Sequence, residues 1–106
     1  MAEKTLKKRK NSSLPVVLIR PSIIGCSYEE PSPGWTDTFS AAGGITIAGS
    51  LGIINYVCGD GDNIADLIPV DIVSNLILTS SAIYSKTPGL QVIHCGTSHL
   101  NPISWY

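Results

Sequence analysis

The sequence has few cysteines and no long hydrophobic run, and each of these shortages excludes a class of protein. No apolar run approaches the roughly 18 residues that a transmembrane helix needs, and the N-terminus is charged where a secretory signal would be hydrophobic. We therefore expect a soluble chain that faces the cytosol. The three cysteines, Cys26, Cys58 and Cys95, are odd in number and widely spaced, which argues against a disulfide framework and predicts reduced, partly buried thiols.

The familiar patterns of catalytic and metal sites are also missing. The sequence contains no GxGxxG turn after a strand, no Walker loop for phosphates and no nucleophile elbow. His94, Cys95 and His99 resemble a metal trio but lack a fourth ligand, and the acidic turn Gly59–Asn63 lacks the glutamate that closes an EF-hand loop. The residues by themselves therefore indicate no metal site and no complete catalytic group.

Charge is divided unevenly along the chain. Residues Met1–Lys10 hold five of the seven basic residues and one acid, a net charge of +4, while the remaining chain holds two bases and seven acids, a net charge of −5. A basic tail on an acidic body is one pattern of nucleic-acid binding. This tail lacks aromatic side chains to stack on bases, and its residues favour helix, with Glu3 four positions before Lys7. We therefore expect a solvated helix over Met1–Lys10 and no nucleic-acid partner.

The 106 residues alternate between strand and helix patterns, as is typical of one small α/β domain. Leu14–Ile19 is a β-branched run closed by Arg20-Pro21, which predicts a parallel strand buried on both faces and ended by the proline. After a turn at Thr87–Gly89, Leu90–Cys95 predicts another apolar strand, and Ile53–Val57 predicts a third.

Helical patterns lie among these strands. Asp71 is expected to cap a helix that runs to about Tyr84, with an apolar face made by Val73, Leu76, Ile77 and Ile83. Ala65–Val70 is expected to be a short extended piece. Asp66 and Asp71 flank its apolar part, where turn formation and capping account for them as well as catalysis does.

Two further stretches predict helix, and a third predicts no element. Gly34–Ala42 predicts one or two helical turns around Trp35 and Phe39, and Asn101-Pro102 predicts the start of a helix. Residues 43–52 are rich in glycine, alanine and isoleucine but show no clear period, so they predict no element.

A loop follows the first strand, at the position where open α/β sheets bind ligands. Ser22–Pro33 is expected to form this loop, in which Ile23 and Ile24 predict an apolar wall with free backbone N–H and C=O groups. Such a surface suits a flat ring that bears an amide, such as nicotinamide. The stretch Tyr28–Asp37 combines prolines, aromatics and carboxylates, which predicts an ordered loop rather than a solvated linker.

Three segments of the chain resemble one known family: VVLIRPSIIGCSYEEPSPGWTD, ADLIPVDIVSNLIL and VIHCGTSHLNPISW. They are similar to the latter part of the NAD(P)-binding domain of fatty acyl-CoA reductases, the male-sterility-type branch of the extended short-chain dehydrogenases. The RP motif followed by an apolar pair and glycine is shared with sugar epimerases, whereas the EPxPGW core is much more selective. The resemblance runs over practically the whole chain.

The resemblance implies a partial Rossmann-like domain, truncated at both ends, in an enzyme that reduces long-chain acyl-CoA to fatty alcohol with NADPH. The residues that it implies for cofactor binding are Pro21, Ser22, Ile23 and Ile24. Tyr28 and Trp35 would lie over the acyl or pantetheine side of the cleft. The family is expected in the cytoplasm or on the cytosolic face of a peroxisomal or endoplasmic reticulum membrane.

The chain departs from the family in its catalytic group. The tyrosine and lysine that assist the reduction, spaced YxxxK on one helix, are absent, so no catalytic residue is assigned and we expect the isolated chain to be inactive. The resemblance divides the chain into 1–11, the end of the helix that would carry YxxxK, 14–52, a strand and the cleft loop, and 53–106, a strand, a helix, a strand and a helix start. Two alternatives stay open: another extended short-chain dehydrogenase, such as a sugar-nucleotide epimerase, and a truncated, non-catalytic binding or scaffold protein.

Overall fold

The computed structural model of the chain describes residues 2–8, 13–39 and 41–105. Helices and strands alternate in it, which confirms the predicted α/β class. The elements in chain order are α1 (Ala2–Lys8), β1 (Pro15–Pro21), β2 (Ile23–Gly25), α2 (Ala41–Ser50), β3 (Leu67–Pro69), α3 (Val70–Tyr84) and β4 (Gly89–Cys95).

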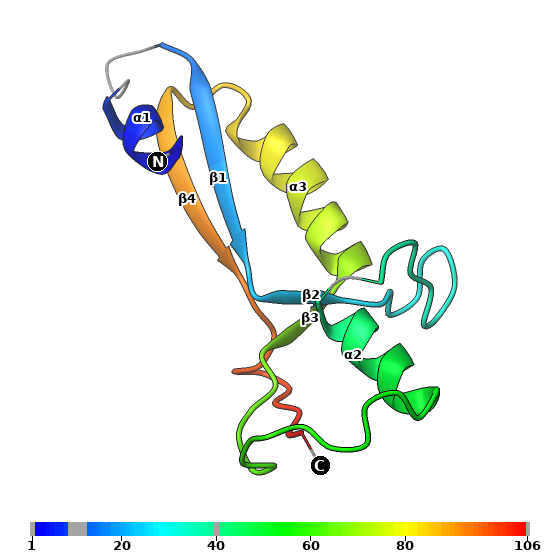
Figure 1. Ribbon diagram of the computed structural model, residues 1–106. Coiled ribbons are helices and arrows are strands. Elements are labelled where there is room, and N and C mark those ends of the chain that lie inside the picture. The colour runs from blue at the N-terminus through cyan, green and yellow to red at the C-terminus, as the bar shows by residue number, and fades with distance from the viewer. Residues whose placement is uncertain (1, 9–12, 40, 106) are drawn as a thin grey trace.

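Two parallel strand pairs form the framework of the molecule. β1 pairs with β4 over its whole length, with Pro21 opposite Cys95 at the carboxyl ends, and β2 pairs with β3, with Ile23 opposite Leu67. Ser22 alone separates β1 from β2, so the chain passes directly from one sheet into the other (Figure 1). α3 runs along β1 and β4, and α2 lies beside the second pair (Figure 1).

A small hydrophobic core lies where the two strand pairs meet α3. Its buried members are Ile68, Val73 and Cys95, and the half-buried Ile19 and Leu76 pack against them. The predicted parallel strand over Leu14–Ile19 is confirmed, with its end extended to Pro21. Its predicted burial on both faces is wrong, because α3 is the helix that packs along β1 and the strand residues 15–20 are only half-buried.

α1 confirms the helix expected near the N-terminus, although Met1, Arg9 and Lys10 lie outside the described residues. Arg20 ties this helix to β1: its Nε donates to one carboxylate oxygen of Glu3 at 3.0 Å, and its Nη2 contacts the other. This pairing raises the pKa of the Arg20 guanidinium. No helix among the described residues is both long and apolar enough to span a membrane.

The predicted helix to Tyr84 is confirmed as α3, and the predicted strand after the turn at Thr87–Gly89 is confirmed as β4. The predicted apolar face of α3 is only half right. Val73 is buried and Leu76 is half-buried, but Ile77 and Ile83 are exposed, and Ser80 is buried in their place. The Ser80 hydroxyl can be buried because it donates to the carbonyl oxygen of Ile77 at 3.1 Å.

The secondary structure between β2 and β3 differs most from the predictions. α2 begins at Ala41 and occupies the stretch for which no element was predicted, while 34–39 forms no helical turn and Ser22–Pro33 includes β2. Ile53–Val57 is not a strand, and it pairs with no strand in the described part of the chain. Asn101 starts no helix in the described part of the chain; instead Ser104 forms an antiparallel bridge with Ile64.

Candidate functional site

The segment between β2 and α2 contains a loop that closes around Ser27. The buried Ser27 donates its N–H to the carbonyl oxygen of Trp35 at 3.0 Å, and its own carbonyl oxygen accepts the N–H of Gly34 at 2.9 Å. Its hydroxyl donates to the carbonyl oxygen of Ser32 at 2.5 Å and accepts the N–H of Trp35 at 3.1 Å. Gly34 makes the turn with φ of 78°, a conformation that glycine adopts without strain. The predicted ordered loop therefore exists, and a serine closes it.

Asp71, in the first turn of α3, holds the near end of this loop. One carboxylate oxygen accepts the N–H of Tyr28 at 3.0 Å, and the other accepts those of Glu29 at 2.9 Å and Glu30 at 3.1 Å. These hydrogen bonds, that of Tyr28 foremost, lower the pKa of Asp71 from 3.8 to about 2. The predicted capping role is wrong: α3 begins at Val70, so Asp71 lies inside the first turn, and Pro69 holds the cap position without a side-chain hydrogen bond.

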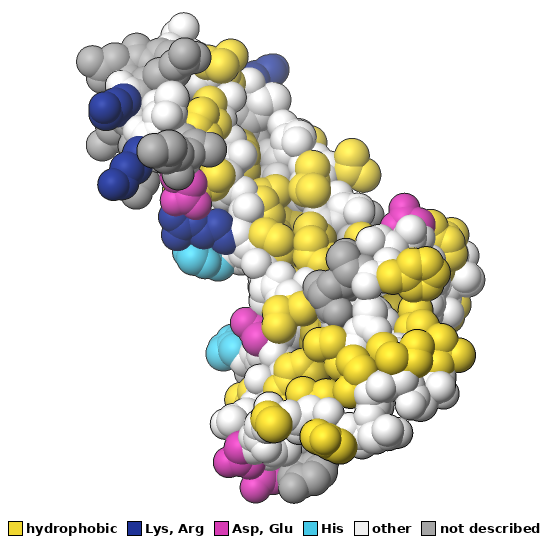
Figure 2. Space-filling view, viewed as in Figure 1, with side chains coloured by type: hydrophobic (Ala, Val, Ile, Leu, Met, Phe, Trp, Pro, Cys, Tyr) yellow, Lys and Arg dark blue, Asp and Glu magenta, His cyan; other side chains and the backbone are white. Residues whose placement is uncertain are grey.

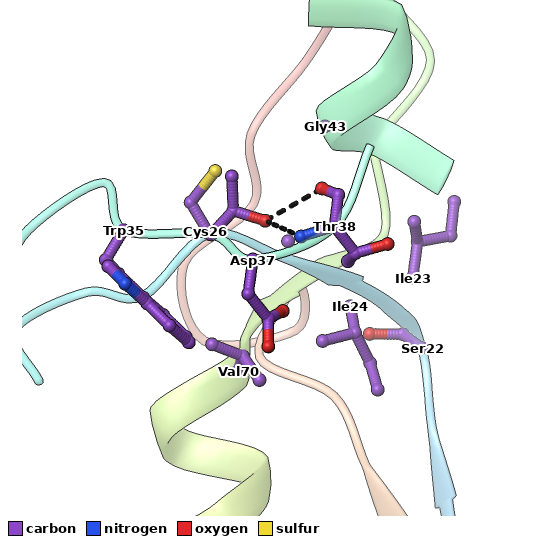
Figure 3. Close-up of a pocket in the computed structure, with 11 residues that line it drawn as sticks. Ser22, Ile23, Ile24, Cys26, Trp35, Asp37, Thr38, Gly43 and Val70 are labelled. Carbon is purple, nitrogen blue, oxygen red and sulfur yellow. Dashed lines mark hydrogen bonds between the residues drawn. The ribbon is translucent and has the colours of Figure 1, made fainter. Parts of the chain in front are cut away.

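A cavity of about 500 Å³ lies between this loop, β2 and the two neighbouring helices, within the size range of ligand pockets. Figure 3 shows Trp35 and Asp37 of the loop, the β2 residues Ile23 and Ile24, and Val70 of α3 around it. Its lining is mostly apolar. The complete lining is Ser22, Ile23, Ile24, Gly25, Cys26, Trp35, Thr36, Asp37, Thr38, Gly43 and Val70.

Three of the four residues predicted for cofactor binding, Ser22, Ile23 and Ile24, line this cavity. The Ser22 hydroxyl is buried and has no hydrogen-bond partner among the described residues. One expectation is wrong: the backbone N–H of Ile23 is not free but donates to the carbonyl oxygen of Asp66 at 2.9 Å, because β2 pairs with β3. Pro21, the fourth residue, is exposed at the end of β1 and is not part of the lining.

The two residues predicted for substrate binding are separated. Trp35 lines the cavity, whereas Tyr28 is 71% exposed and is not part of the lining. Trp35 and Tyr28 belong to one loop, but Tyr28 lies at the end that meets Asp71. No observation on the structure tests the binding roles of these six residues, which stay predictions.

Sequence reasoning missed several residues of the cavity wall. Cys26, Thr36, Asp37 and Thr38 belong to the same loop as Trp35, so their proximity in the chain was the available signal. The Thr36 hydroxyl donates to the carbonyl oxygen of Thr38 at 3.0 Å and accepts its N–H at 3.4 Å, which shapes this end of the loop (Figure 3). Gly43 had no such signal, because α2 was not predicted.

Small, mostly polar residues follow the carboxyl ends of β1 and β4, near the Ser22 part of the cavity lining. Ser22 follows β1, and Gly96, Thr97 and Ser98 follow β4, which runs parallel to it. The Thr97 hydroxyl donates to the carbonyl oxygen of Leu67 at 3.2 Å, and the Ser98 hydroxyl donates to a carboxylate oxygen of Asp66. A run of small polar residues after an apolar strand was the signal for this group.

The described residues contain no group of three histidine, cysteine or acidic side chains that could hold a metal ion. All three cysteines are free, with Cys95 buried and Cys26 and Cys58 exposed. Burial raises the pKa of the Cys95 thiol.

Comparison of the sequence with known proteins shows which family the chain belongs to. The sequence model of a family of NAD-binding domains, described as "Male sterility protein", matches residues 1–77. The chain belongs to this male sterility family.

Its curated relatives are named as fatty acyl-CoA reductases. It is 38% identical over 101 residues to human Fatty acyl-CoA reductase 1, covering 92% of this chain and 19% of that protein, and 39% identical to the Xenopus laevis protein over the same length. It is 35% identical over 106 residues to Probable fatty acyl-CoA reductase 5 of Arabidopsis thaliana, covering 99% of this chain and 21% of that protein. The chain thus spans about a fifth of the length of these relatives. The predicted resemblance to fatty acyl-CoA reductases is confirmed, and with it a partial Rossmann-like domain.

Membership in the male sterility family makes this chain part of an oxidoreductase family whose domain binds a nicotinamide cofactor. The cavity residues fit the nicotinamide end of such a cofactor. Ile23 and Ile24 offer apolar surface to a flat ring, and the orphaned Ser22 hydroxyl needs a polar partner such as a carboxamide.

Proposed function

We propose that this chain is the part of a fatty acyl-CoA reductase that forms one wall of the cofactor and substrate cleft. The observation that carries the proposal is the cavity at the carboxyl end of β1. Its lining includes Ser22, whose hydroxyl has no partner among the described residues, and Trp35 of the loop that contains the EPxPGW core. Ligands bind at this edge of open α/β sheets. The names of the relatives support the reductase assignment.

Each part of the cavity has a role in this proposal. The Ser22 hydroxyl binds the carboxamide of the nicotinamide, and Ile23 and Ile24 contact its ring. Trp35 faces the acyl or pantetheine part of the substrate, and the exposed Tyr28 lies on the approach to the cleft. Pro21 stiffens the chain before Ser22, since its ring fixes φ.

The reaction proposed for the whole protein is the reduction of long-chain acyl-CoA to fatty alcohol with NADPH. The cofactor, when bound, supplies hydride to the thioester carbonyl. This chain orients the ring and shields it from water through its apolar wall. The tyrosine and lysine that would assist at the carbonyl oxygen are not among its residues, because none of its tyrosines has a lysine four positions on. By resemblance, the protein works in the cytoplasm or on the cytosolic face of a peroxisomal or endoplasmic reticulum membrane.

Titration of the ¹⁵N-labelled chain with NADPH, followed by NMR, tests the cofactor assignment. We expect weak binding that shifts the amide resonances of Ser22, Ile23 and Ile24 and the indole N–H of Trp35. Ser22→Ala should weaken binding by about 1 kcal/mol, roughly fivefold, through the lost hydrogen bond. Addition of palmitoyl-CoA should cause no NADPH oxidation above background.

Ser81→Ala is the matched control, since Ser81 is exposed on α3 and bonds only locally, to the carbonyl oxygen of Ile77 at 2.7 Å. It should leave the NADPH titration unchanged. Shifts confined to residues away from the cavity would contradict the cofactor assignment. Oxidation of NADPH by the purified chain with palmitoyl-CoA would contradict the assignment of the catalytic pair to another part of the protein.

A further inference from the structure

The Ser27–Trp35 loop, which contains the EPxPGW core, makes two sets of hydrogen bonds with different functions. The inner set joins Ser27 to Ser32, Gly34 and Trp35 and closes the loop on itself. The outer set consists of the three N–H groups of residues 28–30, which all donate to the carboxylate of Asp71. The loop is therefore a closed unit, and the Asp71 side chain attaches it to α3.

This attachment acts on the cavity from outside it. Asp71 does not line the cavity, but the next residue toward the N-terminus, Val70, does. The loop that Asp71 holds continues into Trp35, Thr36 and Asp37, which form the facing wall. The distance between the two walls thus depends on how the loop docks on the first turn of α3.

The chemistry of the contact suits a fixed dock. Two carboxylate oxygens accept three N–H groups at 2.9 to 3.1 Å, and hydrogen bonds to a charged acceptor are stronger than neutral ones. Pro31 follows directly and carries no N–H, so the run of donors ends at Glu30. The loop therefore offers Asp71 three consecutive donors, and the carboxylate satisfies all of them.

We propose that Asp71 is a positioning residue, which docks the preassembled Ser27–Trp35 loop on α3 and so sets the position of the Trp35 wall of the cavity. The inference deepens the proposed function and rests on this cavity being the binding site. Asp71 contacts neither cofactor nor substrate in this role. It acts through the backbone of Tyr28, Glu29 and Glu30.

Amide hydrogen exchange and tryptophan fluorescence of the full 106-residue chain test the proposal without cofactor or acyl-CoA, so its failure is separable from that of the proposed function. In the wild-type chain, the amides of residues 28–30 should exchange several-fold more slowly than those of the exposed Tyr56 and Val57. Asp71→Asn keeps one acceptor oxygen but loses the negative charge and places an amide NH₂ where the other oxygen accepted, so at least one of these three amides should lose its bond and the amides of residues 28–30 should exchange faster. In a Trp105→Phe background, acrylamide should quench the remaining Trp35 more strongly in Asp71→Asn.

Asp66→Asn is the matched control. It makes the same change of charge at the other end of β3, where Asp66 accepts the hydroxyl of Ser98 and does not contact the loop. It should leave both readouts unchanged.

The inner set of hydrogen bonds separates docking from folding. In Asp71→Asn, Gly34 and Trp35 should keep their amide protection, because their bonds to Ser27 remain. Loss of protection at Gly34 and Trp35 together with residues 28–30 would overturn the proposal in favour of a general folding role. Equal exchange of residues 28–30 and of Tyr56 and Val57 in the wild-type chain would overturn it even where the variant fails to fold.

Discussion

Ile68 and Ile53 are the same residue type in two regions of the molecule, but they are 1% and 72% exposed. Ile68 lies in β3 and belongs to the core where the two strand pairs meet α3. Ile53 follows α2, in the stretch 51–60, in which every residue is exposed. The difference teaches that apolar character does not decide burial in this chain; a partner surface does.

The region of Ile53 is unusual in its surface. Residues 38–59 contain no charged side chain, yet many of them are exposed, among them Phe39, Leu51 and Tyr56. Hydrophobic side chains gather on the face of the molecule around α2 (Figure 2). The radius of gyration of 17.1 Å exceeds the roughly 13 Å expected of a compact domain of this length, in agreement with the amount of apolar surface that is left uncovered.

The largest expected contrast comes from shortening one isoleucine to alanine in each region. Ile68→Ala should lower the free energy of unfolding by about 2–5 kcal/mol, because it leaves a cavity in a small core. Since whole domains are stable by only about 5–15 kcal/mol, this loss removes a large share of the stability of the chain. Urea denaturation followed by circular dichroism measures the loss.

Ile53→Ala is the matched control for Ile68→Ala. The same deletion on an exposed side chain should change the free energy of unfolding by less than about 0.5 kcal/mol. Equal losses for the two variants would mean that the exposed side chain of Ile53 is covered in solution.

Two glycines of α2 sharpen the comparison inside the apolar region. A Cβ atom at Gly44 would clash with the carbonyl oxygen of Phe39, whereas at Gly49 the nearest atom, the carbonyl oxygen of Ile54, lies 4.0 Å away. Gly44→Ala should therefore destabilise the chain by about 1–3 kcal/mol through overpacking. Gly49→Ala should stabilise it by about 0.5–1 kcal/mol, as expected for alanine in an exposed helix. Thermal unfolding of the two variants measures both signs, and a stabilising Gly44→Ala would show that Phe39 does not pack against α2.

Cysteine alkylation gives the smallest of the three contrasts. Cys95 is buried in the core and its thiol pKa is raised by burial, so at a given pH it holds less of the reactive thiolate. Cys58 is exposed in the apolar region. Iodoacetamide should therefore label Cys58 several-fold faster than Cys95, as measured by mass spectrometry of peptides. The gap should narrow as pH rises, and comparable rates at neutral pH would argue against the buried position of Cys95.

The elements that the sequence predicts well lie in the region of Ile68. The β-branched run before Arg20-Pro21 and the apolar run to Cys95 are strands in both prediction and structure, and the helix ends at Tyr84 as expected. Continuous β-branched runs and regular apolar spacing are local signals, which survive where tertiary packing agrees with them.

The failures lie where the local signal is weak or needs a partner. α2 has glycine, alanine and isoleucine without a period, so only its contacts with the β2 region select the helix. Ile53–Val57 has strand composition, but a strand forms only beside another strand. Asn101-Pro102 has the start signal of a helix, yet the backbone there pairs through Ser104 with Ile64 instead.

The candidate site divides in the same way. The sequence by itself determined that a loop with prolines, glycine and aromatics follows the first strand, and that Ser22, Ile23 and Ile24 stand at its start, because these are properties of consecutive residues. Only the tertiary structure decided that Ser27 closes the loop, that the Asp71 carboxylate binds residues 28–30 instead of capping the helix, and that Trp35 rather than Tyr28 faces the cavity. These contacts join residues up to 43 positions apart, and such pairs are chosen by the packing of β2, β3 and α3 rather than by local sequence.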